Sequence, residues 1–335
     1  MHIKITERFH PFSHTFGTFC VLPGSTLRLQ IFPALIVVHD LLNAVPKLVA
    51  EIPVPAIGPI KEFTVQLDLE KGCVHVWGED SNGYFRYRIF SDGPLVFEVD
   101  KGLSSWTPTL GSIKQVVPAK FVFTDRLSLG NHKSQDWDMV KRRDNLAEIL
   151  PTWLRLGQFV EEPKYIACEG TASLLNGCQN ISRTHIYDVL HKLFNLAFEG
   201  ILSPRLTDEL HQGFQLTPPP AALSPLILLT EGAKVIRSLF VHFDHNNIFI
   251  LPRLPPQFHC GRLLQVRCGE LGLLDFEWTK KMIRRMVFQA ETTGPIQFHF
   301  PKDIARFRLN GKMHDTQQPV NIEKGQTYTF DRFTK

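Results

Sequence analysis

Short segments in which apolar and polar residues alternate recur along most of this chain and constrain its fold more than any other feature. In Leu27–Ile31 the apolar side chains alternate with Arg28 and Gln30, and Phe63–Leu69 has the same two-residue period. Successive side chains of a strand point to opposite faces, so this period indicates half-buried strands. Pro and Gly, 23 and 22 of the 335 residues, separate such segments, as is typical of all-β domains.

The composition supports the same conclusion. The chain contains 26 Phe against 5 Tyr and 5 Trp, and aromatic side chains favour half-buried sheet surfaces. Hydrophobic residues make up 43% and charged residues 21%, as in ordinary globular domains, so disorder is not expected. A length of 335 residues suffices for about two domains.

The pattern changes to a helical period in residues 138–213. One stripe of apolar residues at helical spacing consists of Leu146, Ile149, Leu150, Trp153 and Leu154. Pro151 lies inside this stripe and predicts a kink or two shorter helices, while Gly157 is placed to end it. A second stripe ends near Gly200, and Ser203-Pro204 predicts the start of a third helix.

Strands return after the proline-rich stretch Thr217–Pro220, which we take as a domain boundary. They include Val235–Phe243 and a hairpin signal at Asn310-Gly311. The sequence therefore predicts a mainly β protein with a helical middle, in which two antiparallel β-sandwich domains are joined by a short α-helical segment. We assign residues 1–130 to the N-terminal sandwich, 131–216 to the helical linker segment and 217–335 to the C-terminal sandwich.

Charge and hydropathy exclude several classes of partner. A net charge of +4 without a basic stripe argues against nucleic acid. The densest basic run, Lys141–Arg143, is followed by Asp144 and is interpreted as a solvated helix face. No apolar run reaches the ~18–20 residues of a membrane span, so no membrane association is expected. The oligomeric state is left open.

The start of the chain and its cysteines suggest a cytoplasmic protein. Met1–Glu7 contains no apolar core of a secretory signal, although export without a cleaved signal is left open. The six cysteines form no Cys-x-x-Cys pair, so we expect free thiols rather than a disulfide framework. No cofactor is expected. His242–His245 has the residue types of a metal site but is interpreted as a turn.

The loop before the first predicted helix combines an aromatic residue with polar groups suited to a sugar. If the protein binds a saccharide, we expect the site at His132, Gln135, Asp136 and Trp137. Sugars have an apolar face that stacks on aromatic rings and hydroxyls that bind amides and carboxylates. The alternative is that an aspartate caps the helix and Trp137 packs it against the sandwich.

Catalytic residues are not identified by any self-sufficient motif. Phosphate-loop, nucleophile-elbow and zinc-protease motifs are absent from the sequence. The candidate acids are Asp136, Asp138 and Glu169. Glu169 follows Cys168 and precedes Gly170, so it could act as a general acid if buried. The alternative is a solvated loop carboxylate.

Part of the C-terminal region resembles a known family. Asn247–Arg262 contains two Leu-Pro pairs, Leu251-Pro252 and Leu254-Pro255, followed by Gly261. It resembles the Leu-Pro segment near the C-terminus of family 95 glycoside hydrolases, the inverting α-L-fucosidases and their relatives. Segments that fit the strands following it in that family are Leu263–Arg267, Leu274–Trp278, Met282–Ala290 and Phe307–Gly311. Phe258 stands where the family has Trp, and Cys268-Gly269-Glu270 replaces a glycine pair.

The resemblance implies a C-terminal β-sandwich and a carbohydrate-related function. In that family the catalytic carboxylates lie in a helical barrel between two sandwiches, and this chain has far too few helical stripes to build one. No catalytic residue is therefore carried over. The expected function is that of a glycan-binding or scaffold protein. The alternatives are an active glycoside hydrolase, α-L-fucosidase-like, with a site at the domain junction, and a structural protein-interaction module.

Overall fold

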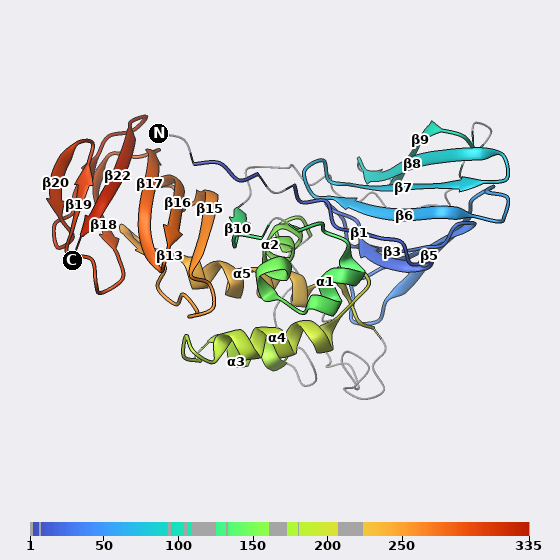
Figure 1. The fold of residues 1–335 in the computed structure, drawn as a ribbon, viewed down its shortest axis with the longest axis horizontal. Coiled ribbons are helices and arrows are strands. Elements are labelled where there is room, and N and C mark those ends of the chain that lie inside the picture. The colour runs from blue at the N-terminus through green and yellow to red at the C-terminus, as the bar shows by residue number, and fades with distance from the viewer. Residues whose placement is uncertain are drawn as a thin grey trace.

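The computed structural model describes residues 3–6, 8–92, 95–103, 106, 108, 125–131, 133–160, 173–179, 181–206 and 224–334. Sheets occupy both ends of the elongated molecule, and helices lie between them (Figure 1). The fold is mainly β with mostly antiparallel, sandwich-like sheets, which confirms the predicted class. None of the described helices is long and apolar enough to cross a membrane.

The N-terminal sheets form from the alternating segments. One has the order β1 (Phe12–Ser13), β6 (Lys61–Asp68), β7 (Cys73–Asp80), β8 (Gly83–Ser91) and β9 (Leu95–Lys101). The other has the order β2 (Thr18–Val21), β3 (Leu27–Ile31), β4 (Leu35–Asp40) and β5 (Lys47–Pro53). The alternation has the expected cause, because Leu29 and Ile31 of β3 are fully buried while Gln30 between them is half-buried.

The C-terminal sheets also form from segments with alternating apolar and polar residues. The larger contains β10 (Arg126–Ser128), β15 (Cys260–Arg267), β16 (Gly272–Thr279), β17 (Met282–Ala290), β22 (Thr327–Thr334), β19 (Arg306–Leu309) and β20 (Lys312–Asp315). The smaller contains β13 (Val241–Asp244), β14 (Asn247–Ile250), β18 (Gly294–His299) and β21 (Val320–Ile322). Asn310-Gly311 joins β19 to β20 as predicted. Much of the phenylalanine lies here, for example Phe298 and Phe307, whose rings both contact Phe330.

The helices between the sheets are α1 (Trp137–Arg143), α2 (Leu146–Gly157), α3 (Ser173–Gln179), α4 (Ile186–Ala197) and α5 (Ile227–Phe240). Pro151 lies inside α2 without dividing it. The chain breaks instead before α2, where Asp144 ends α1 in the left-handed conformation with φ 51°.

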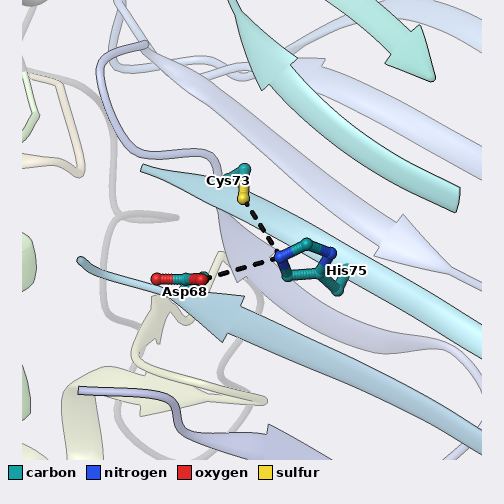
Figure 2. A group of neighbouring side chains, drawn as sticks. All are labelled: Asp68, Cys73 and His75. Atoms are coloured by element: carbon teal, nitrogen blue, oxygen red, sulfur yellow. Dashed lines mark hydrogen bonds and ion pairs between the residues drawn. The ribbon is translucent and has the colours of Figure 1, made fainter. Parts of the chain in front are cut away.

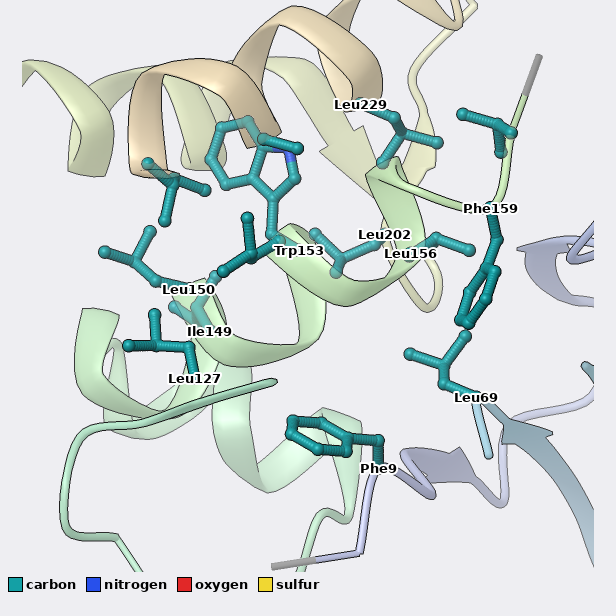
Figure 3. Packing of buried hydrophobic residues seen from close by; sticks show 14 of the residues in the cluster. Phe9, Leu69, Leu127, Ile149, Leu150, Trp153, Leu156, Phe159, Leu202 and Leu229 are labelled. Carbon is teal, nitrogen blue, oxygen red and sulfur yellow. The ribbon is translucent and has the colours of Figure 1, made fainter. Parts of the chain in front are cut away.

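Close contact between α2 and α5 explains two glycines. A Cβ on Gly157 would lie 2.3 Å from the carbonyl oxygen of Leu229, and a Cβ on Gly232 would lie 2.4 Å from the ring of Trp153. Gly157 is therefore the last helical residue and a contact point, rather than the helix cap that the sequence predicts. Figure 3 shows this core, where Trp153 of α2 lies among apolar side chains from distant segments.

Two predictions in the helical region are wrong. Val235–Phe243 was expected to be a strand, but α5 extends to Phe240 and only β13 after it is extended. Its residues Ala233, Ile236 and Phe240 face the core at helical spacing. Ser203-Pro204 does not begin a helix, because it forms the short strand β12, paired with β11 (Phe198–Glu199). The proposed boundary at Thr217–Pro220 lies outside the described residues.

Two segments connect the opposite ends of the molecule. β10 lies within residues 1–130, which we assigned to the N-terminal sandwich, but it pairs with β15 of the C-terminal sheet. The strap, defined here as residues 3–6 and 8–11, runs from the C-terminal sheet across the helices to β1 (Figure 1). At its start, Ile3 packs against Leu264 and Val287.

Candidate functional site

A cavity of about 430 Å³ lies where the strap, β10 and the first two helices meet. Its described polar lining residues are Thr6, Arg8, His10, Gln66, Ser128, Asn131, Lys133, Ser134, Gln135 and Glu148. Apolar surface is added by the aromatic residues Phe9, Phe12 and Trp137. Concave sites that combine apolar walls with a few polar groups are typical of small-molecule binding, so this junction pocket is the candidate site.

The junction loop predicted from the sequence forms part of the pocket wall. Gln135 lines the pocket and holds the strap, because its Oε1 accepts a hydrogen bond of 2.7 Å from the amide of His10. Its carbonyl oxygen accepts another from the amide of Phe12 at 3.0 Å. Gln135 thus fixes the end of the strap and the start of β1 against the loop. His132, the first of the predicted binding residues, lies outside the described residues.

Asp136 and Trp137 occupy structural positions. Asp136 is the N-cap of α1, and its Oδ1 accepts hydrogen bonds from the amides of Asp138 and Met139. Trp137 is 1% exposed and meets Phe194 edge-on, with ring centroids 6.4 Å apart. These contacts match the alternative of a helix cap and a packed ring, because a ring this buried offers no free face for stacking a sugar.

Asp138 is also engaged. Its Oδ2 accepts hydrogen bonds from the hydroxyls of Ser13 at 2.9 Å and Thr15 at 3.0 Å. Its Oδ1 lies 3.6 Å from the ammonium of Lys141. Asp138 therefore fastens α1 to the start of the N-terminal sheets. Glu169, the third candidate acid, lies outside the described residues.

The carboxylate that does reach the pocket is Glu148, which the sequence did not single out. Its side chain is 3% exposed. It binds the guanidinium of Arg143 through both oxygens, which raises the pKa of Arg143. The ammonium of Lys133 lies 3.8 Å away. An arginine five residues before an acid in the first turn of a helix was the available signal.

His10 connects the pocket with a buried group of side chains in the N-terminal sandwich. Its Nε2 lies 3.0 Å from Oδ1 of Asp68, which is 2% exposed. Burial raises the pKa of Asp68, but hydrogen bonds from His10, from His75 and from the Lys71 amide together lower it well below its usual range. Burial and the charge of Asp68 raise the pKa of Cys73 to about 11, so this cysteine is a thiol at neutral pH.

Comparisons with protein-family models and with curated proteins find no match for this chain.

The His242–His245 segment forms a turn. Asp244 pairs with Asn247 across the β13–β14 hairpin, and His245 has φ 49°. His245 and Asp244 contact each other at 2.7 Å, but both side chains are largely exposed. The cysteines in the described part of the chain, Cys20, Cys73, Cys178, Cys260 and Cys268, are free, and Cys168 lies outside it.

Proposed function

We propose that this protein binds a saccharide in the junction pocket without hydrolysing it. The observation that carries the proposal is the pocket lining, in which Gln66, Asn131, Lys133 and Ser134 occur together with apolar residues. Such groups donate to and accept from sugar hydroxyls. The family resemblance of the C-terminal sandwich to parts of glycoside hydrolases supports the same class of ligand.

The pocket gives binding more support than hydrolysis. Glycosidases generally need two carboxyl groups, separated by roughly 5–9.5 Å, on either side of the scissile bond. Among the described lining residues Glu148 alone carries a carboxylate, and Arg143 binds both of its oxygens. Asp136 and Asp138 are held by the helix cap and by Ser13 and Thr15. We propose in addition that the protein works in the cytoplasm, in keeping with its free thiols.

The test begins with a glycan array of the purified protein, followed by calorimetry with the best-bound glycan. Gln66→Ala and Lys133→Ala each remove one polar group from the pocket wall. We expect each to weaken binding about tenfold, since a hydrogen bond to a ligand contributes roughly 1–2 kcal/mol.

Matched controls remove the same side chains elsewhere. Gln289→Ala on β17 and Lys312→Ala on β20 change exposed positions of the C-terminal sheet. They should leave the affinity unchanged. Absence of glycan binding, or equal losses in pocket and control variants, would refute the proposal. Release of free sugar by the wild-type protein would instead support the hydrolase.

A further inference from the structure

A hairpin of the N-terminal sandwich brings three different metal-binding side chains together. Asp68 ends β6 and faces Cys73 at the start of β7 in the strand register. His75 lies two residues further along β7 and therefore on the same face as Cys73. Figure 2 shows the three side chains converging. Their exposed fractions are 2%, 3% and 4%, so the group is buried.

The contacts meet at a single nitrogen. Nε2 of His75 lies 3.4 Å from Sγ of Cys73 and 3.6 Å from Oδ2 of Asp68. In a nucleophile–histidine–acid relay the two partners bind different ring nitrogens, so this geometry does not fit a relay. It does fit ligands around a common centre, and the three ligand atoms all lie within 4.8 Å of one another.

Two of the three separations between ligand atoms also match a tetrahedral site. Zinc binds sulfur, nitrogen and oxygen at about 2.0–2.3 Å, which places neighbouring tetrahedral ligands roughly 3.3–3.8 Å apart. The contacts of 3.4 and 3.6 Å fall in this range. We therefore propose that Asp68, Cys73 and His75 form a zinc-binding site, with the fourth position left for water or another donor.

The ligand types select the metal. A thiolate and an imidazole suit zinc, whereas calcium and magnesium prefer sites made only of oxygen. Zinc binding displaces the thiol proton of Cys73 to solvent, and the resulting thiolate and the Asp68 carboxylate balance the divalent cation, as a buried charge requires. Asp68, Cys73 and His75 supply this combination among the described residues.

Neighbouring groups orient the ligands. Oδ1 of Asp68 accepts hydrogen bonds from the amides of Glu70 at 3.0 Å and Lys71 at 2.9 Å, and it contacts His10. Oδ2 is thereby directed towards His75. Metal bound at Nε2 places the ring proton of His75 on Nδ1. The 3.5 Å contact between Arg86 and Nδ1 is then no longer a hydrogen bond, because a guanidinium only donates, and Arg86 keeps its ion pair with Asp100 at 3.3 Å.

The proposal is tested on the full chain with metal alone. The protein is stripped with a chelator under reducing conditions and titrated with Zn²⁺ by calorimetry and with Co²⁺ by absorption spectroscopy. We expect one equivalent of either metal. Cobalt should give the intense visible bands of a tetrahedral site and a near-ultraviolet thiolate-to-cobalt band.

Three variants test which residues bind the metal. Cys73→Ser should abolish the thiolate band and weaken zinc binding by more than about a hundredfold, since loss of a ligand exceeds the ~10–100-fold effect of an outer-shell change. His10→Gln removes one of the groups that hold Asp68 and leaves all three metal ligands in place. It should therefore weaken zinc binding by about 10–100-fold and retain the thiolate band. Cys260→Ser, at a partly exposed thiol on β15, is the control and should bind as wild type does.

The cobalt spectra of the wild type and the variants decide between the possible outcomes. No thiolate band in wild type, a band that persists in Cys73→Ser, or one lost in Cys260→Ser would overturn the proposal. If Cys73→Ser does not fold, the wild-type cobalt spectrum and His10→Gln decide the question. Saccharide binding can succeed or fail without affecting these results.

Discussion

Single residues of the junction loop show how one set of side chains can suit two roles. Asp136 and Trp137 have the residue types of a sugar site and equally those of a helix start. Their contacts decide between the roles, because Asp136 accepts hydrogen bonds from the first helical amides and Trp137 is 1% exposed. Burial depends on what packs over a residue, in this case Phe194 of a helix far along the chain.

Trp137→Ala should therefore destabilise the protein by about 3–5 kcal/mol, the usual cost of removing a buried aromatic ring. The matched control is Met139→Ala on the same helix, where the side chain is 41% exposed and the change should stay within about 0.5 kcal/mol. Urea denaturation followed by far-ultraviolet circular dichroism measures both. An unchanged midpoint for Trp137→Ala together with lost glycan binding would restore the stacking role.

The residues around the pocket could be predicted only in part. The loop was identified because it is short, polar and placed at a change of period, and Gln135 does line the cavity. His10 was missed because it reaches the pocket through a contact between distant segments, and Glu148 was missed although its partner Arg143 lies only five residues away. His10 binds Gln135 across 125 positions of sequence. No local sequence pattern predicts such a contact between distant residues.

At the scale of elements, a row of charges crosses three strands of the C-terminal sheet. Glu277 of β16 lies opposite Arg262 of β15 and Arg285 of β17 in the strand register. It accepts hydrogen bonds from both guanidinium groups. Burial raises the pKa of Glu277, but the two arginines outweigh it and lower this pKa. Cross-strand pairs of this kind stabilise sheets.

Glu277→Gln should cost about 0.5–1 kcal/mol at neutral pH, since solvent screens these partly exposed pairs. The folded-state pKa is the lower one, so the stabilisation is present above the unfolded value of about 4.3 and is lost as pH falls through the folded value. Unfolding free energies measured between pH 7 and pH 3 should therefore converge for wild type and variant. A difference that stays constant with pH, or one equally large in the exposed control Glu323→Gln, would contradict this interpretation.

Most strands were predictable because the alternating period directly reports which face is buried. Met282–Ala290 has the same bounds in the sequence prediction and in the structure. α5 was not predictable in this way, because Val235–Phe243 contains enough apolar residues to satisfy either period. Packing of Gly232 against Trp153 favours the helix there, and that contact joins segments far apart in the chain.

At the scale of the whole molecule, one acid connects the two ends. Glu70 lies in the turn between β6 and β7, and both of its oxygens accept hydrogen bonds from Arg126 of β10, at 2.6 and 2.8 Å. Arg155 of α2 lies 3.5 Å from the same carboxylate. Burial lowers the pKa of Arg155 to about 10. The guanidinium groups of Arg126 and Arg155 also lie over the ring of Phe9 in the strap.

Glu70→Gln should destabilise the protein by about 1–3 kcal/mol, between the cost of breaking an exposed pair and that of a buried one. It removes the negative charge shared by two arginines. Glu98→Gln makes the same change in the more exposed pair with Arg88, within one sheet, and should cost less than about 1 kcal/mol. Thermal and urea unfolding of both variants measure the difference. Equal effects would show that Glu70 does not couple the two ends.

The strap has a consequence for the order in which the chain folds. Ile3 packs against Leu264 and Val287, so its partners lie far along the sequence and the strap can dock only after they have folded. Contacts of such long sequence separation slow folding. The strap also crosses the helices before it reaches β1, and the carbonyl oxygens of Phe9 and Pro11 accept hydrogen bonds from the amides of Leu69 and Leu67, which come much earlier in the sequence than Leu264. The N-terminal sandwich can therefore form while residues 3–6 remain undocked, and their docking depends on the folding of the C-terminal sheet.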